Sequence, residues 1–283
     1  MNYRHVFHAG NFADVFKHAI LTGLIESLKA KQTPFRYLDT HAGAGKYDLR
    51  GEQARKTREH EAGVQRLLNA VRLPAALHIY LNLVRALNSE NATHDIAIYP
   101  GSPLIASLLM RESDHATLCE LQADETARLK ELFAGDARIF VHQRDGYAAL
   151  TALLPPPERR GLVLIDPPFE AQEAEFDAIQ GALNSALKRW PTGMYAIWYP
   201  IKLRHPTQRF RRWFEQRRIP KVLCAEMLLH PDNSALRLNG CGMVIVNPPW
   251  KFDRQLAELL PVLREHLAQG RFGEQRVEWL TGE

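Results

Sequence analysis

The apolar residues of this chain follow two spacings that alternate along its length. Behind Asn11, a residue type that caps helices, apolar side chains recur at helical spacing and predict a helix to about Lys29. Residues 161–165 are instead continuously apolar after an initial glycine, which is typical of a strand buried on both faces. The pattern therefore predicts both amphipathic helices and fully buried strands.

Elements of these two kinds are expected to alternate. Further strands are expected at residues 35–38, 116–120, 138–142, 193–199, 222–229 and 242–246, and further helices at 104–110, 125–132 and 146–153. This order predicts an α/β fold with a doubly wound, mostly parallel sheet. Ligands of such sheets bind outside the carboxyl ends of the strands, so residues that directly follow strands are the candidates for a site.

One long segment interrupts the alternation. Residues 47–97 carry apolar residues at helical spacing and no convincing strand, so we expect a helical insertion subdomain there. It would divide one α/β domain into two parts. Residues 1–46 would hold the first helix, the first strand and the turn after it, and residues 98–283 would complete the sheet.

Composition restricts the class of protein. No apolar run reaches the ~18 residues that a membrane span requires, and the start of the chain lacks the apolar core of a secretory signal, so we expect a cytosolic protein. Cys119, Cys224 and Cys241 lie far apart without a C-x-x-C spacing. Neither a disulfide framework nor a metal site is therefore expected, and the cysteines are interpreted as small apolar fillers.

Charge is distributed unevenly. The chain has 36 Lys and Arg against 32 Asp and Glu, a balance too mild to identify a partner. Residues 202–221, however, carry eight basic residues against one acid, with Phe210, Trp213 and Phe214 between them. This favours a surface that neutralises phosphates and stacks bases; the alternative is a solvated helix face whose aromatic rings point inward. A second basic run consists of Lys46, Arg50, Arg55, Lys56 and Arg58.

A glycine-bearing turn follows the first predicted strand. It runs from Asp39 to Gly45 and includes His41 and Gly43. Because glycine lacks a Cβ and tolerates positive φ, the backbone could pass close to a bound nucleotide. An ordinary strand–helix turn has the same composition, so the turn alone does not decide between the two.

Acidic residues close the next two strands. An acid at the position of Glu120 can accept hydrogen bonds from both hydroxyls of a ribose. Asp145 could accept a hydrogen bond from the exocyclic amine of a cofactor adenine, and Gly146 would leave room for the adenine ring. Taken singly, each of these residues is also typical of a turn or a helix cap.

The most specific motif is Asp166-Pro167-Pro168-Phe169, directly after the buried strand at 161–165. An aromatic amine is difficult to methylate because its lone pair is delocalised into the ring. Asp166 and the Pro167 carbonyl can each accept one N–H of such an amine, since prolines leave their carbonyls free as acceptors. Phe169 can stack on an extruded base. Asp166, Pro167 and Phe169 are therefore the predicted catalytic residues.

A second motif, Asn247-Pro248-Pro249-Trp250, has a similar composition and also follows an apolar strand. In the methyltransferase variant of this fold the last strand runs antiparallel, so its carboxyl end points away from the cofactor cleft. We therefore expect the second motif to be structural.

With these motifs the chain resembles adenine-N6 methyltransferases that carry a D-P-P-aromatic motif, and more narrowly the RlmJ family of bacterial large-subunit (23S) ribosomal RNA adenine-N6 methyltransferases. The resemblance runs nearly end to end. It is carried by Tyr3-Arg4-His5, Phe7-His8-Ala9-Gly10-Asn11, Ala13-Asp14-Val15, Lys17-His18, residues 38–45, 99–103 and 164–168, Trp198-Tyr199-Pro200 and residues 247–251. The amino-terminal stretch is especially specific, because generic methyltransferases lack it. A helical insertion after the first strand is also a family trait.

The resemblance implies a Rossmann-like class I methyltransferase that uses S-adenosylmethionine to methylate the N6 amine of an adenine in large-subunit ribosomal RNA. Asp166 would be the catalytic residue. The cofactor site would be lined by His18, His41, Gly43, Ser102, Glu120, Asp145, Gly146 and Asp166. RNA would be contacted by Tyr3, Lys17 and Phe169. No metal is needed, and we expect a monomer that acts on naked or precursor ribosomal RNA.

Two residues depart from the wider class. His41 stands where glycine is usual, although the narrow family shares the histidine, and Phe169 stands where tyrosine is commoner. The change to Phe169 keeps base stacking but excludes a role for a phenol hydroxyl. Three other functions stay open at this point: a DNA adenine methyltransferase, a protein glutamine methyltransferase, and a non-catalytic RNA-binding module that keeps the fold.

Overall fold

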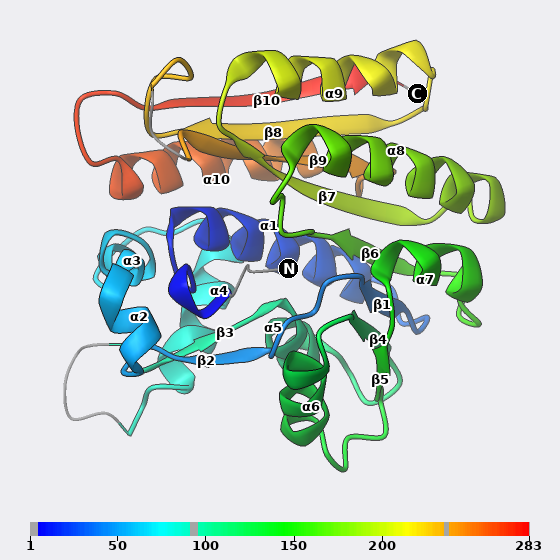
Figure 1. Ribbon diagram of the computed structural model, residues 1–283, viewed down its shortest axis with the longest axis horizontal. Coiled ribbons are helices and arrows are strands. Elements are labelled where there is room, and N and C mark those ends of the chain that lie inside the picture. Colours follow the sequence, from blue (N-terminus) through cyan, green and yellow to red (C-terminus); the bar gives the residue numbers. More distant parts are fainter. Residues whose placement is uncertain (1–4, 91–95, 235–237, 283) are drawn as a thin grey trace.

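The computed structural model describes residues 5–90, 96–234 and 238–282 and is built around an eight-stranded sheet in the order β10-β8-β9-β7-β6-β1-β4-β5 (Figure 1). Its strands are β1 (Arg36–Asp39), β4 (His115–Glu120), β5 (Ile139–Gln143), β6 (Gly161–Ile165), β7 (Met194–Ile201), β8 (Val222–Leu228), β9 (Gly240–Val246) and β10 (Glu274–Thr281). The strands from β5 to β7 in this order are parallel, whereas β9 runs antiparallel to β7 and β8, and β10 antiparallel to β8. This confirms the predicted α/β fold with a doubly wound, mostly parallel sheet of the Rossmann-like type.

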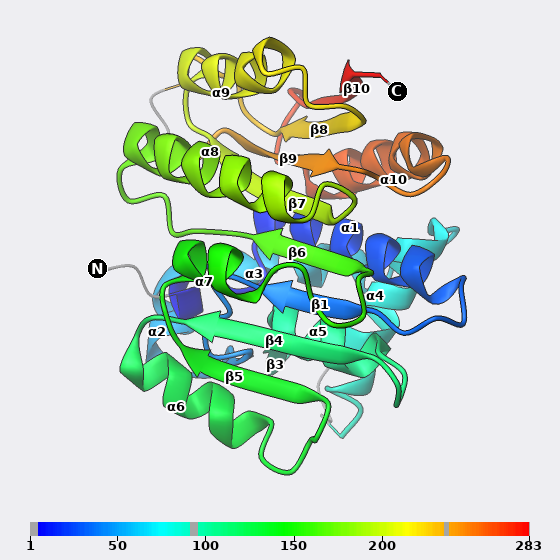
Figure 2. The ribbon, with the colours of Figure 1, turned by 90° about the vertical axis from the view of Figure 1, so that its right-hand side faces the viewer.

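Helices cover both faces of the sheet (Figure 2). One face is covered by α1 (Phe12–Lys29), α5 (Ser102–Leu109), α6 (Ala123–Leu132) and α10 (Phe252–Leu267), and the other by α7 (Gly146–Leu153), α8 (Gln172–Arg189) and α9 (Arg204–Gln216). In β6, Leu162 and Leu164 pack into the first layer, while Val163 and Ile165 pack into the second, because successive side chains of a strand point to opposite faces. Burial on both faces explains why this strand is continuously apolar.

The segment after β1 is largely helical but begins and ends in strand. Short strands β2 (Lys46–Asp48) and β3 (Ile98–Pro100) pair antiparallel. Between them lie α2 (Glu52–Thr57), α3 (Glu59–Ala62), the 3-10 helix η2 (Val64–Leu67) and α4 (Ala75–Ala86). The expectation that residues 47–97 lack a strand is therefore wrong at Tyr47 and Asp48, which lie in β2. Three-residue strands are too short to produce a detectable alternation of polar and apolar residues.

Strand β10 was not expected from the sequence, whereas the state of the three cysteines was. The edge strand β10 was outside the predicted set, because its residues are mostly half-buried or exposed and form no continuous apolar run. The three cysteines are buried and free, as expected for apolar fillers. No helix within the described ranges is long and apolar enough to cross a membrane.

The aromatic residues of the basic segment 202–221 point inward. Phe210 and Phe214 of α9 are 1% and 0% exposed and belong to the core beneath the helix, and Trp213 is half-buried. The favoured interpretation, in which these rings stack on bases, is therefore wrong for Phe210 and Phe214. The alternative of a solvated helix face with inward aromatics describes α9 correctly, because a helix on a sheet needs an apolar face to bury.

The second Pro-Pro motif lies at the opposite edge of the sheet from Asp166. It follows β9, which runs antiparallel to β7, so its carboxyl end faces away from the carboxyl ends of the parallel strands. The Asn247 side-chain amide donates to the carbonyls of Pro191 and Gly193, at 2.9 and 2.8 Å. Asn247 thus holds the turn that enters β7, which agrees with the expected structural role.

Candidate active site

A cavity of about 1180 Å³ opens at the carboxyl ends of the parallel strands. Its walls come from α1, from the segments after β1, β4, β5, β6 and β7, and from the end of the β8–β9 connection. It gathers every described residue that was expected in the site: Lys17, His18, His41, Gly43, Ser102, Glu120, Asp145, Gly146, Asp166, Pro167 and Phe169. Tyr3, expected to contact RNA, lies outside the described residues.

Helix α1 enters the cavity wall with its first two turns. The Asn11 side chain caps this helix by accepting hydrogen bonds from the backbone N–H groups of Ala13 and Asp14, at 3.0 and 2.9 Å. The cap fixes where the helix begins. Asp14 and Lys17 are three residues apart and therefore lie on the same face, which is turned toward β6.

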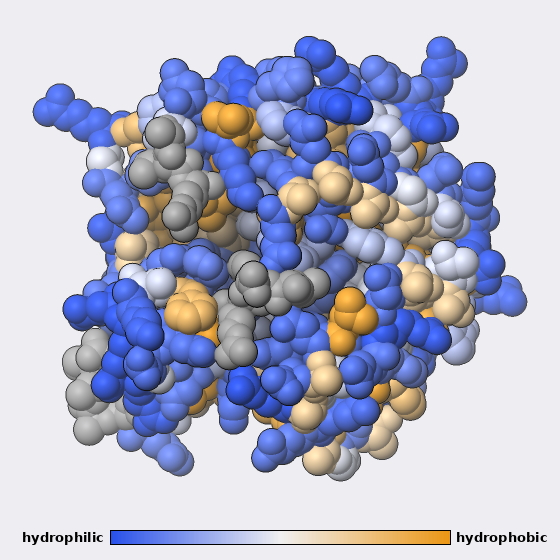
Figure 3. Space-filling view, viewed as in Figure 1, coloured by the Kyte–Doolittle hydropathy of each residue, from blue (hydrophilic) through white to orange (hydrophobic). Residues whose placement is uncertain are grey.

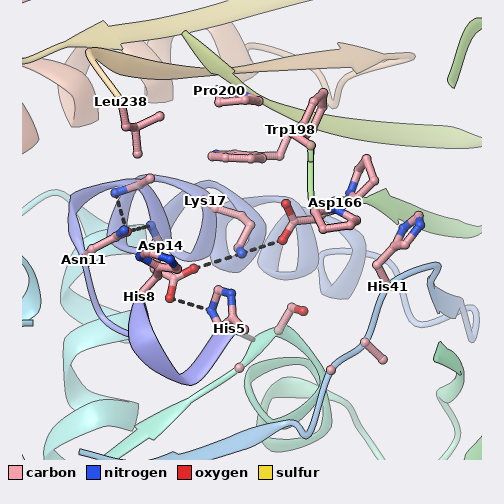
Figure 4. Close-up of a pocket in the computed structure, with 18 of the residues that line it drawn as sticks. His5, His8, Asn11, Asp14, Lys17, His41, Asp166, Trp198, Pro200 and Leu238 are labelled. Carbon is pink, nitrogen blue, oxygen red and sulfur yellow. Dashed lines mark hydrogen bonds and ion pairs between the residues drawn. The ribbon is translucent and has the colours of Figure 1, made fainter. Parts of the chain in front are cut away.

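Lys17 forms the central contact of the site (Figure 4). Its Nζ lies 2.5 Å from Asp166 Oδ2 and 2.9 Å from Asp14 Oδ1, and its side chain is only 6% exposed. Burial by itself would lower the pKa of Lys17, but the carboxylates of Asp14 and Asp166 outweigh it and raise the pKa well above the ordinary value. The structure thus places a permanent cation between two carboxylates, a role different from the RNA contact expected for Lys17.

Asp14 is held from two further sides. Its Oδ2 accepts a hydrogen bond from the Gly10 backbone N–H at 3.0 Å and contacts His5 Nε2 at 2.9 Å. Burial opposes its charge, yet the neighbouring His5 and Lys17 keep the pKa of Asp14 well below its usual range. His5 and Asp14 were not singled out as site residues in the sequence, although both stand within the amino-terminal stretch that carries the family resemblance.

Asp166 presents one carboxylate oxygen to Lys17 and keeps the other available. In the described part of the chain, no hydrogen bond is made to its Oδ1. Its side chain is 15% exposed and lies on the cavity wall. Asp166 can therefore accept a hydrogen bond from a ligand without giving up its ion pair.

Phe169 is not presented for stacking in the way the motif suggested. It has a positive φ of 49°, is 3% exposed, and its ring packs edge-to-face on Phe176 and Trp198. The half-buried Trp198, in contrast, lines the cavity with its ring over Lys17, at 5.9 Å from Nζ to the ring centroid (Figure 4). Trp198 was missed as a site residue because it lies inside β7, before the strand end where site residues were sought.

The turn after β1 is braced by a buried acid. Asp39 is fully buried; its Oδ2 accepts hydrogen bonds from the hydroxyls of Tyr37 (2.6 Å) and Ser102 (2.7 Å), and its Oδ1 from the His41 backbone N–H (3.2 Å). Burial raises the pKa of Asp39 to about 6, while these donors oppose the rise. The Ser102 hydroxyl, expected to bind cofactor, is thus engaged in holding the turn.

His41 carries its ring proton on Nδ1. The Thr40 hydroxyl donates its single proton to the Leu164 carbonyl at 2.9 Å, so its contact with His41 Nδ1 at 2.8 Å requires the histidine to donate. Burial lowers the pKa of His41 to about 4, against the opposing charges of Asp166 and Asp145, and the ring is neutral at pH 7. Nε2 is then an acceptor, so through this nitrogen His41 can receive a hydrogen bond from a ligand.

Glu120 and the start of α7 form the other end of the cavity. Glu120 is 8% exposed and accepts from the backbone N–H groups of Gly43, which has a φ of 60°, and Gln122, both at 2.8 Å. Asp145 is exposed and caps α7 through the Ala148 N–H at 2.8 Å. A Cβ on Gly146 would lie 2.1 Å from the Thr40 carbonyl, so only glycine lets α7 begin this close to the turn.

His18 contributes a buried nitrogen that lacks a protein partner. The residue is 1% exposed; its Nδ1 contacts the Tyr99 hydroxyl at 2.8 Å, and this hydroxyl contacts that of Tyr80 at 2.9 Å. Nε2 makes no hydrogen bond to any described residue. Burial, followed by the charge of Lys17, lowers the pKa of His18 well below its ordinary value, so the ring is neutral.

A family model and two curated relatives point to the same family, and a solved structure shares the fold. A family model described as "Ribosomal RNA large subunit methyltransferase D, RlmJ" matches residues 32–281. The chain is 42% identical over 283 residues to the Ribosomal RNA large subunit methyltransferase J of Escherichia coli (strain K12), and 41% identical to that of Haemophilus influenzae, with 100% of each chain covered. A crystal structure of a protein from Legionella pneumophila str. Philadelphia 1 has a TM-score of 0.86 and 34% identity, and covers 96% of this chain and 98% of that one.

Proposed function

The chain belongs to the RlmJ family of ribosomal RNA large subunit methyltransferases, and from this premise we propose that it methylates the exocyclic N6 amine of an adenine in large-subunit ribosomal RNA. Family membership makes it an S-adenosylmethionine-dependent rRNA methyltransferase. Adenine as the base and N6 as the acceptor are the proposal. They are supported by the chemistry of the Asp166-Pro167-Pro168 segment and by the cavity in front of it.

The residues present fit S-adenosylmethionine. Two carboxylates, Glu120 and Asp145, lie near the strand ends where an acid would hold ribose hydroxyls and an adenine amine. Each of their oxygens keeps a lone pair free even where it accepts one backbone N–H. Nε2 of His18 is buried and has no hydrogen-bond partner among the described residues, and a bound cofactor could supply one. We propose that these residues, with His41, Gly43, Ser102, Gly146 and Asp166, hold the cofactor. When bound, it supplies an electrophilic methyl group on a sulfonium.

For the target base, we propose that Asp166 Oδ1 and the Pro167 carbonyl each accept one N–H of the amine. Positive charge develops on the amine nitrogen as it is methylated, and the site is prepared for it. Asp14, Lys17 and Asp166 together carry a charge of −1, and their side chains are at most 15% exposed. The observation that carries this assignment is the Lys17–Asp166 contact, which fixes the acid and leaves one of its oxygens facing the cavity.

Stacking on the base is assigned to Trp198, with Phe169 supporting that ring from its edge. Tyr3 and Lys17 stay in the proposal as residues near the RNA, Lys17 acting through Asp166. The expected monomeric state is kept in the proposal, since one chain supplies every described residue that was expected in the site. Naked or precursor RNA as substrate and the cytosol as its location complete the proposal.

The test is methyl transfer from radiolabelled S-adenosylmethionine to unmodified bacterial ribosomal RNA. We expect label to appear as N6-methyladenosine in the large-subunit RNA and to fall at least about 100-fold with Asp166→Asn, which keeps the shape but removes the charge. Urea unfolding of both proteins serves as the control for folding.

Three outcomes would contradict the proposal. Label in duplex DNA, or in a protein glutamine, with none in RNA would show that RNA is not the methyl acceptor. Label in RNA at a position other than adenine N6 would show that the proposed target atom is wrong. Cofactor binding without transfer to any RNA would indicate a non-catalytic RNA-binding module.

A further inference from the structure

The chain has two basic segments near the cavity, and the structure separates them by how their charges are paired. In the segment from β2 to α3, Arg50 pairs with Asp48 at 2.8 Å, Lys56 with Glu52 at 3.0 Å and Arg58 with Glu61 at 2.5 Å. Three of the five cations of this run therefore have a carboxylate from their own segment, while Lys46 and Arg55 form no ion pair in the described ranges. The positive charge that the sequence suggested there is largely compensated.

The segment of α9 is different. Arg209 and Arg212 on the helix, and Arg217 and Arg218 just after it, are exposed and form no ion pair with any carboxylate in the described ranges. The two other arginines of the helix are paired, Arg204 with Asp232 and Arg211 with Glu226 and Glu278. Four positive charges without an ion-pair partner in the described ranges thus lie on α9 and on the turn that follows it.

Packing turns these arginines outward. Phe210 and Phe214 are one turn apart and buried against the sheet, so the face that carries Arg209 and Arg212 is directed to solvent. Figure 1 places α9 along the β8–β10 side of the molecule, and Figure 3, in the same view, shows hydrophilic residues over this side. The exposed face offers guanidinium groups without an aromatic platform.

This face begins at the cavity. Lys202, just before α9, lines the cavity and donates to the Phe169 carbonyl at 3.2 Å. The 13 residues of α9 extend about 20 Å from there, at 1.5 Å per residue. At about 3.4 Å per phosphate along one strand of a helical nucleic acid, this length matches roughly six phosphates.

We propose that the RNA strand that flanks the target adenine leaves the cavity over Lys202 and follows the arginine face of α9, bound through its phosphates. The inference rests on the proposed function, since it takes RNA as the substrate. Because Phe210 and Phe214 are buried, this surface binds independently of base sequence and positions the RNA, while the cavity selects the base. The compensated segment from β2 to α3 carries a minor part of the phosphate contacts.

The experiment compares two double variants that each remove two positive charges from a helix: Arg209→Gln/Arg212→Gln in α9, and Arg55→Gln/Lys56→Gln in α2. Binding of a large-subunit RNA fragment is measured at several salt concentrations, together with KM and kcat for its methylation. We expect the α9 variant to lower RNA affinity about 10- to 30-fold near physiological salt, and to reduce the slope of log K against log salt by about 1.5. Its kcat at saturating RNA and its binding of S-adenosylhomocysteine should match the wild type.

Two outcomes would overturn the inference. If the α2 variant loses the salt slope and the α9 variant keeps it, RNA leaves the cavity over the insertion. If neither variant changes RNA affinity, neither segment is the track. In both cases, methylation of RNA by the wild type in the same assay would still support the proposed function. If the proposed function itself is wrong, the wild type will not methylate RNA.

Discussion

Lys17 Nζ lies 2.5 Å from Asp166 Oδ2, so a buried ammonium of the first helix holds the acid at the end of β6. Replacing it in Lys17→Met leaves Asp14 and Asp166 buried without their cation. We expect the free energy of unfolding to fall by about 3 kcal/mol, as for other broken buried ion pairs, and methyl transfer to fall at least about 100-fold. Urea unfolding and the radiolabel assay measure the two effects.

Lys29 gives a matched control for this variant. It lies on the same helix and pairs with Glu26 at 2.6 Å, but both side chains are about 30% exposed. Solvent screens such a pair, so Lys29→Met should cost below about 1 kcal/mol and leave methyl transfer unchanged. Equal losses for the two variants would show that the Lys17 pair has no special role.

Trp198 is expected to be the stacking platform for the target base. Its ring lines the cavity above Lys17, whereas Phe169 is buried beside it. Since base–aromatic stacking is worth about 1–3 kcal/mol, Trp198→Ala should weaken productive RNA binding by about 5- to 150-fold in kcat/KM. Trp198→Phe, which keeps an aromatic ring, should recover most of this loss. An alanine variant with wild-type kcat/KM would assign stacking elsewhere.

Tyr99 sets which nitrogen of His18 carries the proton. We propose that His18 Nε2 donates to the carboxylate of the cofactor. The ring then carries its proton on Nε2, so Nδ1 must accept from the Tyr99 hydroxyl. Tyr99→Phe removes that hydroxyl and should weaken binding of S-adenosylhomocysteine about fivefold, the worth of about one hydrogen bond. Nitrogen NMR of His18 should show the Nε2–H form in the wild type and a mixture in the variant.

Tyr80→Phe controls for this effect, because Tyr80 contacts the Tyr99 hydroxyl and makes no hydrogen bond to His18. It should change cofactor affinity less than Tyr99→Phe. If nitrogen NMR instead finds the proton on Nδ1 in the wild type, His18 presents an acceptor to the cofactor and the assignment to the carboxylate fails.

His41 should make the fold sensitive to acid. Burial depresses its pKa to about 4, below the unfolded value near 6.5, so the unfolded chain takes up the proton first as pH falls. Stability from this group is complete above pH 6.5 and is lost as pH falls toward 4, by at most about 3 kcal/mol. His41→Gln should lose correspondingly less over that range in urea unfolding, and parallel curves for both proteins would contradict the shift. The buried Asp39 is common to both and cancels.

The positions of the site residues were predictable because they depend on local pattern. Asp166 follows a short run of apolar residues whose length and flanking Gly and Pro favour a strand, and parallel strands bring their carboxyl ends to one edge. Knowing that Glu120 and Asp145 also follow strands was therefore enough to place all three around one cavity. The helix from Asn11 was equally readable, since its cap and its apolar spacing are both local.

What the residues do in the site depended on tertiary contacts that no spacing reveals. Lys17 and Asp166 are 149 positions apart, and only the packing of α1 beside β6 joins them. The burial of Phe169 follows from Phe176 and Trp198, which reach it from other elements. The position of the ring proton of His41 depends on the Thr40 hydroxyl. This hydroxyl donates its own proton to the carbonyl of Leu164 in β6, so Nδ1 of His41 must donate to it.

Variants of the second Pro-Pro motif test whether it stabilises the fold or takes part in catalysis. Asn247 has a φ of 54° and donates two hydrogen bonds to the turn before β7, so Asn247→Ala should lower the free energy of unfolding by about 2 kcal/mol. Trp250, which is 83% exposed, should tolerate Trp250→Ala within about 0.5 kcal/mol. Both variants, assayed below their unfolding transitions, should keep wild-type kcat, because β9 points this motif away from the cavity. A folded Asn247→Ala protein without methyl transfer would show that the edge opposite Asp166 takes part in the reaction.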